Sequence, residues 1–135
     1  MSDGKRWSVV IKVESDIVRA RTVGREAAKA LGFGLTDITR IVTAASELAR
    51  NIYRYGVEGE MIAQEIVRDG KKGIELIFAD KGPGIDDIEM AMSEGYSSGK
   101  TMGMGLPGAK KLMDDMYIDS TPGVGATVTI IKWKR

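Results

Sequence analysis

The sequence predicts a two-layer α/β sandwich, in which a mixed, largely antiparallel sheet is covered on one face by helices (an α+β arrangement). Short runs rich in β-branched residues are interleaved with segments whose apolar residues recur at helical spacing. Some of the strand-like runs follow one another directly, as hairpins do. The 135 residues contain no repeat, low-complexity segment or linker-like stretch, so we expect one domain over residues 1–135.

The first part of the chain predicts one strand followed by two helices. The strand is rich in β-branched residues, and polar residues that can cap a helix precede each helical segment. Two glycines, Gly32 and Gly34, separate the two helices. The expected elements are a strand over Ser8–Val13, a helix from Ser15 or Asp16 to about Leu31, and a helix from Thr36 or Asp37 to about Tyr55.

The second part of the chain predicts four strands and two shorter helices. Asp69-Gly70 lies between two apolar runs and is typical of the tight turn of a β-hairpin. The expected strands are Met61–Val67, Gly73–Ala79, Tyr117–Ser120 and Ala126–Trp133, and the expected helices cover Ile85–Met92 and about Gly105–Asp115. The stretch Ser93–Met102 is expected to be flexible.

The composition excludes several kinds of chemistry. With 20 basic and 19 acidic residues the net charge is +1, which gives no electrostatic case for a nucleic-acid or anionic-membrane partner. The chain has neither histidine nor cysteine, so its chemistry must use carboxylates, hydroxyls, amides, Lys, Arg and backbone N–H groups. The N-terminal segment lacks the apolar core of a signal peptide, and we expect a cytoplasmic protein.

Glycines gather in one region of the chain, because nine of the 17 lie between Gly82 and Gly125. Loose surface loops would explain them, and so would a backbone that approaches a ligand closely. The run that ends at Gly99-Lys-Thr lacks the first glycine of a P-loop. Gly103-Met-Gly105-Leu-Pro-Gly108 matches a dinucleotide motif in letters, but no strand runs into it. Gly103 and Gly105 instead precede a helix, whose unpaired N–H groups can hold an anion.

Glu47 and Asn51 lie one turn apart on the second predicted helix, so both side chains leave the same face. A carboxylate can accept the proton of an attacking hydroxyl group. An amide oxygen one turn away can bind Mg²⁺, which prefers hard oxygen ligands. A solvated pair of polar residues is the alternative interpretation of these two positions.

Asp80-Lys-Gly82-Pro-Gly84 follows an apolar strand directly. A carboxylate at a strand end can accept a hydrogen bond from an exocyclic amine such as that of adenine, and the glycines let the turn fold close to a flat ring. An ordinary turn that begins with Asp is the alternative. Thr127, in the last strand, is either a pocket hydroxyl or a good strand former.

Together these motifs resemble, in order and spacing, the GHKL superfamily of ATPases and kinases, which have the Bergerat ATP-binding fold. Its four motifs, the N box and three glycine boxes, are similar to Glu47–Asn51, Asp80–Gly84, Gly103–Leu106 and Gly125–Thr127. The resemblance covers nearly the whole chain. Without a phosphoacceptor histidine, the chain resembles the compact anti-sigma-factor-type serine/threonine kinases, and residues 46–53, 80–85, 105–108 and 131–135 are similar to those of stressosome switch kinases.

The resemblance implies a role for each matched residue. It implies that Glu47 is the general base on a substrate hydroxyl and that Asn51 binds Mg²⁺ beside ATP. The ATP contacts that it implies come from Asn51, Asp80, Gly82, Gly84, Gly103, Gly105 and Thr127. It also implies that the Ser93–Met102 stretch is a lid over the nucleotide. The third box departs from the usual pattern, because Ala126 stands directly after the glycine and Thr127 follows one position later.

The resemblance further implies an ATP-dependent protein serine/threonine kinase of bacterial partner switching. Its substrates would be STAS-domain proteins, such as a stressosome antagonist or scaffold, and its release would activate a downstream effector such as a PP2C-type phosphatase. The alternative is a nucleotide-responsive switch module, or an anti-sigma factor that acts by sequestration with little kinase turnover. Neither a nucleic acid nor a membrane is expected as a partner.

Overall fold

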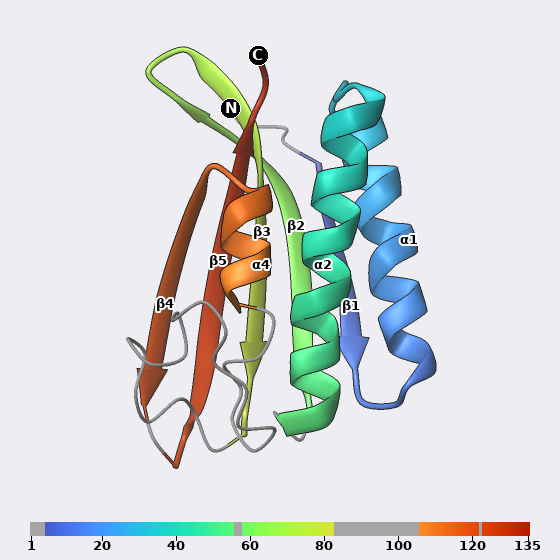
Figure 1. Cartoon of the computed structure of the whole chain (residues 1–135), viewed down its shortest axis with the longest axis vertical. Coiled ribbons are helices and arrows are strands. Elements are labelled where there is room, and N and C mark those ends of the chain that lie inside the picture. Colours follow the sequence, from blue (N-terminus) through green and yellow to red (C-terminus); the bar gives the residue numbers. More distant parts are fainter. Residues whose placement is uncertain (1–4, 56–57, 83–105, 122) are drawn as a thin grey trace.

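The structure is a computed structural model that describes residues 5–55, 58–82, 106–121 and 123–135. In this part of the chain, helices cover one face of a single twisted sheet (Figure 1). The strands are β1 (Arg6–Ile11), β2 (Gly59–Arg68), β3 (Lys71–Asp80), β4 (Asp115–Thr121) and β5 (Gly125–Trp133). The helices are α1 (Ser15–Ala30), α2 (Leu35–Tyr55) and α4 (Leu106–Leu112).

The five strands form one sheet in the order β1-β2-β3-β5-β4. All four neighbouring pairs are antiparallel. β3 therefore lies in the middle, and its last residue, Asp80, is paired with Gly59 on one side and Ala126 on the other. The predicted α/β sandwich with helices on one face is confirmed, but the sheet is not mixed as predicted, because every strand pair in the described residues is antiparallel.

The predicted hairpin between β2 and β3 has a two-residue turn. Arg68 pairs with Lys71, and the two residues between them, Asp69 and Gly70, have φ angles of 51° and 79°. Positive φ at both central positions defines a type I′ turn, whose twist matches that of the flanking strands. Both strands run right up to this turn, which is why they extend beyond the predicted bounds at their turn ends.

The core lies between the helices and the sheet face that they cover. Because side chains alternate between the two faces of a strand, every second residue of β3 points into this core. α1 and α2 approach closely at Gly24, where an added Cβ atom would stand 3.6 Å from the Cβ of Ala45. The largest fully buried side chains of this core belong to Ile11, Ile41, Leu48, Ile52, Met61, Ile74, Leu76, Phe78, Leu106 and Ile130.

The start of α1 differs from the prediction because of Asp16. Its Oδ2 accepts hydrogen bonds from the backbone N–H groups of Lys12 (2.9 Å) and Val13 (3.1 Å), so β1 ends at Ile11 and not at Val13. Asp16 therefore closes the β1–α1 connection and does not cap its own helix. These N–H groups, with a smaller effect from Arg19, lower the pKa of the buried Asp16 carboxyl.

The start of α2 also differs from the prediction. The helix begins at Leu35, and the carbonyl oxygen of Gly34 accepts the N–H of Ile38 at 2.9 Å. Asp37, one of the two predicted caps, lies inside the first turn and pairs with Arg40 at 3.1 Å. The carboxylate there still opposes the positive end of the helix dipole.

α4 ends three residues earlier than predicted because the chain turns there to join the sheet. The buried Lys132 of β5 donates a hydrogen bond from Nζ to the carbonyl oxygen of Leu112 at 3.0 Å. The backbone N–H of Asp114 donates to the carbonyl oxygen of Ile131 at 2.9 Å, and β4 begins at Asp115. Two carboxylates, those of Asp37 and Asp114, lie 3.8 and 3.7 Å from Lys132 Nζ and balance its charge.

The predicted helix over Ile85–Met92 and the predicted flexible stretch Ser93–Met102 lie outside the described residues. None of the helices within the described ranges is both long enough and apolar enough to cross a membrane.

Candidate functional site

α2 carries the two polar residues that the sequence singled out. Asn51 is buried, with 6% of its surface exposed, and Glu47 lies one turn earlier at the helix surface. The helix is amphipathic, so its apolar residues fix which side faces the sheet. Asn51 is thereby held against the sheet, and Glu47, rotated by about 40° around the helix axis, stays accessible to solvent.

Asn51 and Asp80 line one cavity, at the end of β3 and beside the start of α4. Asn51 comes from α2, Asp80 from the last position of β3, and Leu106 from the first position of α4. The remaining walls are apolar and consist of Leu48, Ile52, Phe78 and Val128. The cavity thus combines one amide and one carboxylate with apolar side chains, and among the described residues it encloses a volume of only about 10 Å³. The chemical character of this lining, and not its present volume, matches a flat ring that carries an amine group.

Asp80 begins a turn, and backbone N–H groups surround its carboxylate. Its Oδ1 accepts a hydrogen bond from the backbone N–H of Gly82 at 2.8 Å. Burial raises the pKa of the Asp80 carboxyl, and hydrogen bonds from the N–H groups of Gly82 and Ala126 limit that rise. Gly82 is buried. The predicted turn beyond Asp80 is therefore present as far as the structure describes it.

Two further glycines bring neighbouring strands close to Asp80. At Gly125, whose φ is +153°, a Cβ atom would collide with the carbonyl oxygen of Asp80. At Gly59 a Cβ atom would collide with the carbonyl oxygen of Ala79 and would stand 2.9 Å from Cγ2 of Ile52. Neither glycine was among the predicted site residues. Gly125 was part of the third matched motif, Gly125–Thr127, where only Thr127 was assigned a contact, whereas Gly59 had no signal beyond standing just before a predicted strand.

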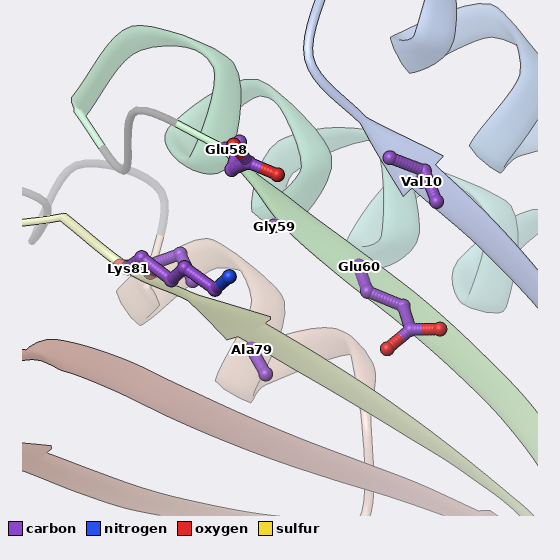
Figure 2. Close-up of a pocket in the computed structure, with 7 residues that line it drawn as sticks. Val10, Glu58, Gly59, Glu60, Ala79 and Lys81 are labelled. Carbon is purple, nitrogen blue, oxygen red and sulfur yellow. The ribbon is translucent and has the colours of Figure 1, made fainter.

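Thr127 is not brought together with Asp80. Thr127 pairs with Ala79, whereas Asp80 pairs with Ala126. Figure 2 shows Ala79 with Val10 and Glu60 at a hollow on the open face of the sheet, the face without helices. Since paired residues of neighbouring strands point to the same face, Thr127 lies on the open face and Ala126 on the covered face, beside Asp80. On the covered face, the side chain of β5 beside the Asp80 carboxylate is therefore that of Ala126 and not that of Thr127.

Glu47 lines a different hollow, between α1 and α2, and not the cavity that holds Asn51. Its Oε1 accepts a hydrogen bond from Arg50 at 2.9 Å, and 39% of its side chain is exposed. Glu47 and Asn51 are one helical turn apart, so the residues through which α2 lines the two hollows are separated by a rise of about 6 Å.

Gly84, Gly103 and Gly105 lie outside the described residues, and the structure resumes at Leu106, the first residue of α4 and a wall of the Asn51 cavity. Within the described ranges no group of three or more acidic residues could by itself hold a metal ion.

Comparison with known proteins shows the family of the chain. Residues 12–132 match the model of the histidine kinase-like ATPase domain. The chain is 49% identical over 127 residues to the serine/threonine-protein kinase RsbT of Bacillus subtilis, an alignment that covers 94% of this chain and 96% of that protein. It is also 34% identical over 120 residues to the anti-sigma F factor of a Thermoanaerobacter species, covering 84% of this chain and 82% of that one.

A solved structure supports the same fold. The chain superposes on part of a crystal structure of the RsbU and RsbW domains of a Mycobacterium tuberculosis protein, with a TM-score of 0.66 and 20% sequence identity. The match covers 99% of this chain and 33% of that longer one. At this identity the likeness concerns the fold alone.

Proposed function

The chain belongs to the histidine kinase-like ATPase domain family and is a close homologue of a serine/threonine-protein kinase, and we propose that it transfers the γ-phosphoryl group of ATP to a serine or threonine of a STAS-domain protein. The observation that carries the proposal is the cavity shared by Asn51 and Asp80. It unites two of the residues that the family resemblance implies for nucleotide binding.

The adenine end of the proposed site is the end of β3. The Asp80 carboxylate would accept a hydrogen bond from the exocyclic amine, and Leu48, Phe78 and Val128 would contact the faces and edge of the ring. The N–H groups of Gly82 and Ala126 already bond to this carboxylate and keep it oriented. Gly59 and Gly125 let the neighbouring strands close around it.

The phosphate end of the proposed site lies toward Asn51. Its amide oxygen is a hard ligand of the kind that Mg²⁺ prefers, and this residue is buried beside the cavity. Because a single amide is a small part of a coordination shell, the remaining ligands of a bound Mg²⁺ would be phosphate oxygens and water. When bound, the ion would neutralise charge on the transferred phosphoryl group. We also propose Gly84, Gly103 and Gly105 as backbone contacts to the nucleotide.

Glu47 is the proposed general base. The hydroxyl oxygen of the substrate would form a bond to the γ-phosphorus, the bond from that phosphorus to the β,γ-bridging oxygen would break, and ADP would leave. Glu47 would accept the hydroxyl proton. Its exposed position suits a base that must reach a residue on another protein, and its pairing with Arg50 fixes its direction. Since ATP is an intracellular substrate, we place the reaction in the cytoplasm.

A second function follows from the anti-sigma F relatives. The chain is 34% identical to such a factor, so a protein that binds and releases partners in response to nucleotide is the alternative. Both roles could belong to one molecule, which would phosphorylate a STAS-domain antagonist or scaffold and, on release, activate an effector such as a PP2C-type phosphatase.

The test is calorimetric titration with ATP, with and without Mg²⁺, followed by transfer of radiolabelled phosphate to STAS-domain proteins. We expect Asn51→Asp to abolish transfer and to weaken Mg-ATP binding, because a carboxylate beside the phosphates repels them. We expect Glu47→Gln to lower transfer by about 10²–10⁴-fold with the ATP affinity kept within about twofold. Circular dichroism checks that both variants fold. Normal transfer by the Asn51 variant would rule out its assigned role, and ATP binding without transfer by the wild type would favour the switch module.

A further inference from the structure

The hollow between α1 and α2 is not used by the nucleotide site described above. α1 contributes Arg21 and Arg25, and α2 contributes residues from its first turn as far as Glu47. The two helices lie side by side over the sheet (Figure 1). Along α2 the hollow is lined by Leu35, Ile38, Thr39, Val42, Thr43, Ser46 and Glu47. It therefore begins at an apolar end and finishes at the proposed general base.

The charge of this hollow is unbalanced. Arg21 and Arg25 are exposed, and in the described part of the chain no carboxylate lies within ion-pair distance of either one. The one carboxylate that lines the hollow, Glu47, is already paired with Arg50. Other arginines of these helices, such as Arg19 and Arg40, have acidic partners on their own helix. Two guanidinium groups thus remain available for an anionic group of another molecule.

The helix packing fixes where these charges lie along the hollow. Gly24 of α1 is level with Ala45 of α2, and the two helices are consecutive and joined by a short connection. Since such helices run antiparallel, Arg21 lies near the level of Glu47, and Arg25 lies one turn closer to the apolar end. That end is marked by Leu35, which is 80% exposed.

The dimensions fit a short stretch of extended polypeptide. Leu35 and Glu47 are separated by a helical rise of about 18 Å, which equals about five residues of extended chain. Thr43 and Ser46 offer hydroxyl groups along the way, whereas Thr39 already donates its hydroxyl hydrogen to the carbonyl oxygen of Leu35 at 3.0 Å. An extended segment that follows this line would meet an apolar side chain first, then the two arginines, and finally Glu47.

We propose that this hollow binds the acceptor-bearing segment of the substrate protein and that it selects acidic residues close to the acceptor. The acceptor serine or threonine lies at Glu47, one or two acidic side chains within about three positions of it bind Arg21 and Arg25, and an apolar side chain about five positions from the acceptor covers Leu35. The identity of Glu47 as the base rests on the proposed kinase function, whereas the binding preference of the hollow can be measured without any transfer.

The experiment uses fluorescent twelve-residue peptides and the full chain, with anisotropy as the readout. Each peptide carries one serine and a leucine five positions from it, on the N-terminal side in one peptide and on the C-terminal side in another. The intervening residues include three aspartates, or three asparagines in the neutral versions. For one of the two placements of leucine, we expect the acidic peptide to bind at least about 10-fold more tightly than its neutral version at low salt. We expect this difference in affinity to shrink as the salt concentration rises.

Two charge-reversal variants locate the binding. Arg21→Glu combined with Arg25→Glu should remove the preference for the acidic peptide. The matched control is Lys71→Glu with Lys72→Glu, an equal change of charge at the β2–β3 turn, and it should keep the preference. Equal binding of acidic and neutral peptides, or equal loss in both variants, would overturn the proposal, the second result indicating general charge attraction.

Mg-ATP titration of the same variants separates this proposal from the kinase function. The arginine double variant should bind Mg-ATP within about twofold of the wild type, because neither arginine lines the Asn51 cavity. If the wild type binds the acidic peptide selectively but does not bind Mg-ATP, the kinase proposal fails and the acidic-segment site stands. If the wild type binds Mg-ATP but binds acidic and neutral peptides equally, the acidic-segment site fails and the kinase proposal stands.

Discussion

Asp80 and Ala126 face each other across the β3–β5 pair, and the backbone N–H of Ala126 donates a hydrogen bond to the Asp80 carboxylate. Together with the N–H of Gly82, it fixes the direction of the one carboxylate in the proposed adenine pocket. In the proposed adenine site the last strand would therefore contribute to base recognition through its backbone, and the side chain at 126 would only have to be small.

Asp80→Asn should change which base the site accepts. Loss of the charged acceptor should weaken ATP binding by about 10- to 100-fold, as expected for a hydrogen bond to a charged group, and GTP binding should change less. Calorimetric titration of both nucleotides measures the ratio. An unchanged preference for ATP over GTP would contradict the role of Asp80.

The same variant should also alter the stability of the nucleotide-free protein. Because burial raises the pKa of Asp80, the stability linked to this group is complete at low pH and decreases as the pH rises through the folded-state pKa. Asp80→Asn should consequently unfold at a higher urea concentration than the wild type at pH 7.5, and the difference should close near pH 4. A variant that is less stable at pH 7.5 would mean that lost hydrogen bonds outweigh the relief of burial.

The opposite orientations of residues 126 and 127 can be tested by a pair of substitutions. Thr127→Val should leave the Mg-ATP affinity within about twofold, because Thr127 lies on the open face of the sheet. Ala126→Val should weaken it by about 10-fold, since extra methyl groups beside Asp80 overpack the site by about 1–3 kcal/mol. If Thr127→Val is the more harmful change, the pairing of β3 with β5 is not the one described here.

Gly125→Ala should destabilise the fold. Its φ of +153° and the closeness of the Asp80 carbonyl leave no room for a Cβ atom, and such strain costs about 1–3 kcal/mol. Gly34 is the matched control, because nothing lies within 4 Å of an added Cβ atom there and its φ is not in the positive range. Because Gly34 precedes the first residue of α2, we expect Gly34→Ala to cost no more than about 1 kcal/mol in urea unfolding, the usual disadvantage of alanine at a helix N-cap, and less than Gly125→Ala. Equal effects of the two substitutions would argue against a close approach at Gly125.

Asp16→Asn should reduce stability in a pH-dependent way. The pKa of Asp16 is lowered in the folded protein, so its contribution is present at neutral pH and disappears as the pH falls through the folded-state pKa. The urea midpoints of wild type and variant should differ clearly at pH 7 and converge below about pH 4. Asp119→Asn, at an exposed position on β4, should show little difference at either pH.

Much of the fold could be predicted because it depends on local chemistry. Asp69-Gly70 supplies the two positive φ angles of the hairpin turn, and the apolar periodicity of α2 identifies both the helix and its buried face. The ends of elements were less predictable. β1 stops where the side chain of Asp16 accepts the N–H groups of Lys12 and Val13, a local contact of a residue interpreted from the sequence as a helix cap. α4 stops where Lys132 bonds to Leu112 and Ile131 bonds to Asp114, and contacts between residues so far apart in the sequence leave no local pattern.

The site was predictable only in part, for a similar reason. The meeting of Asn51 and Asp80 follows from the family resemblance, since nothing local to either residue indicates the other. The face of Thr127 depends on the pairing of β3 with β5, where a shift of one residue reverses every side chain. The hollow proposed to bind a substrate segment was not predicted, because it forms where Arg21 and Arg25 of α1 meet residues of α2, and no local pattern indicates which residues of two helices meet.

The middle position of β3 has a consequence for partly unfolded forms of the protein. Amide protons of a strand bonded along both edges exchange with deuterium only through large openings, whereas those of the outer strands β1 and β4 exchange through local fraying. We therefore expect the slowest-exchanging amides to lie in β3. A molecule that has temporarily lost an outer strand would keep in position the carboxylate at residue 80, which we propose to contact adenine.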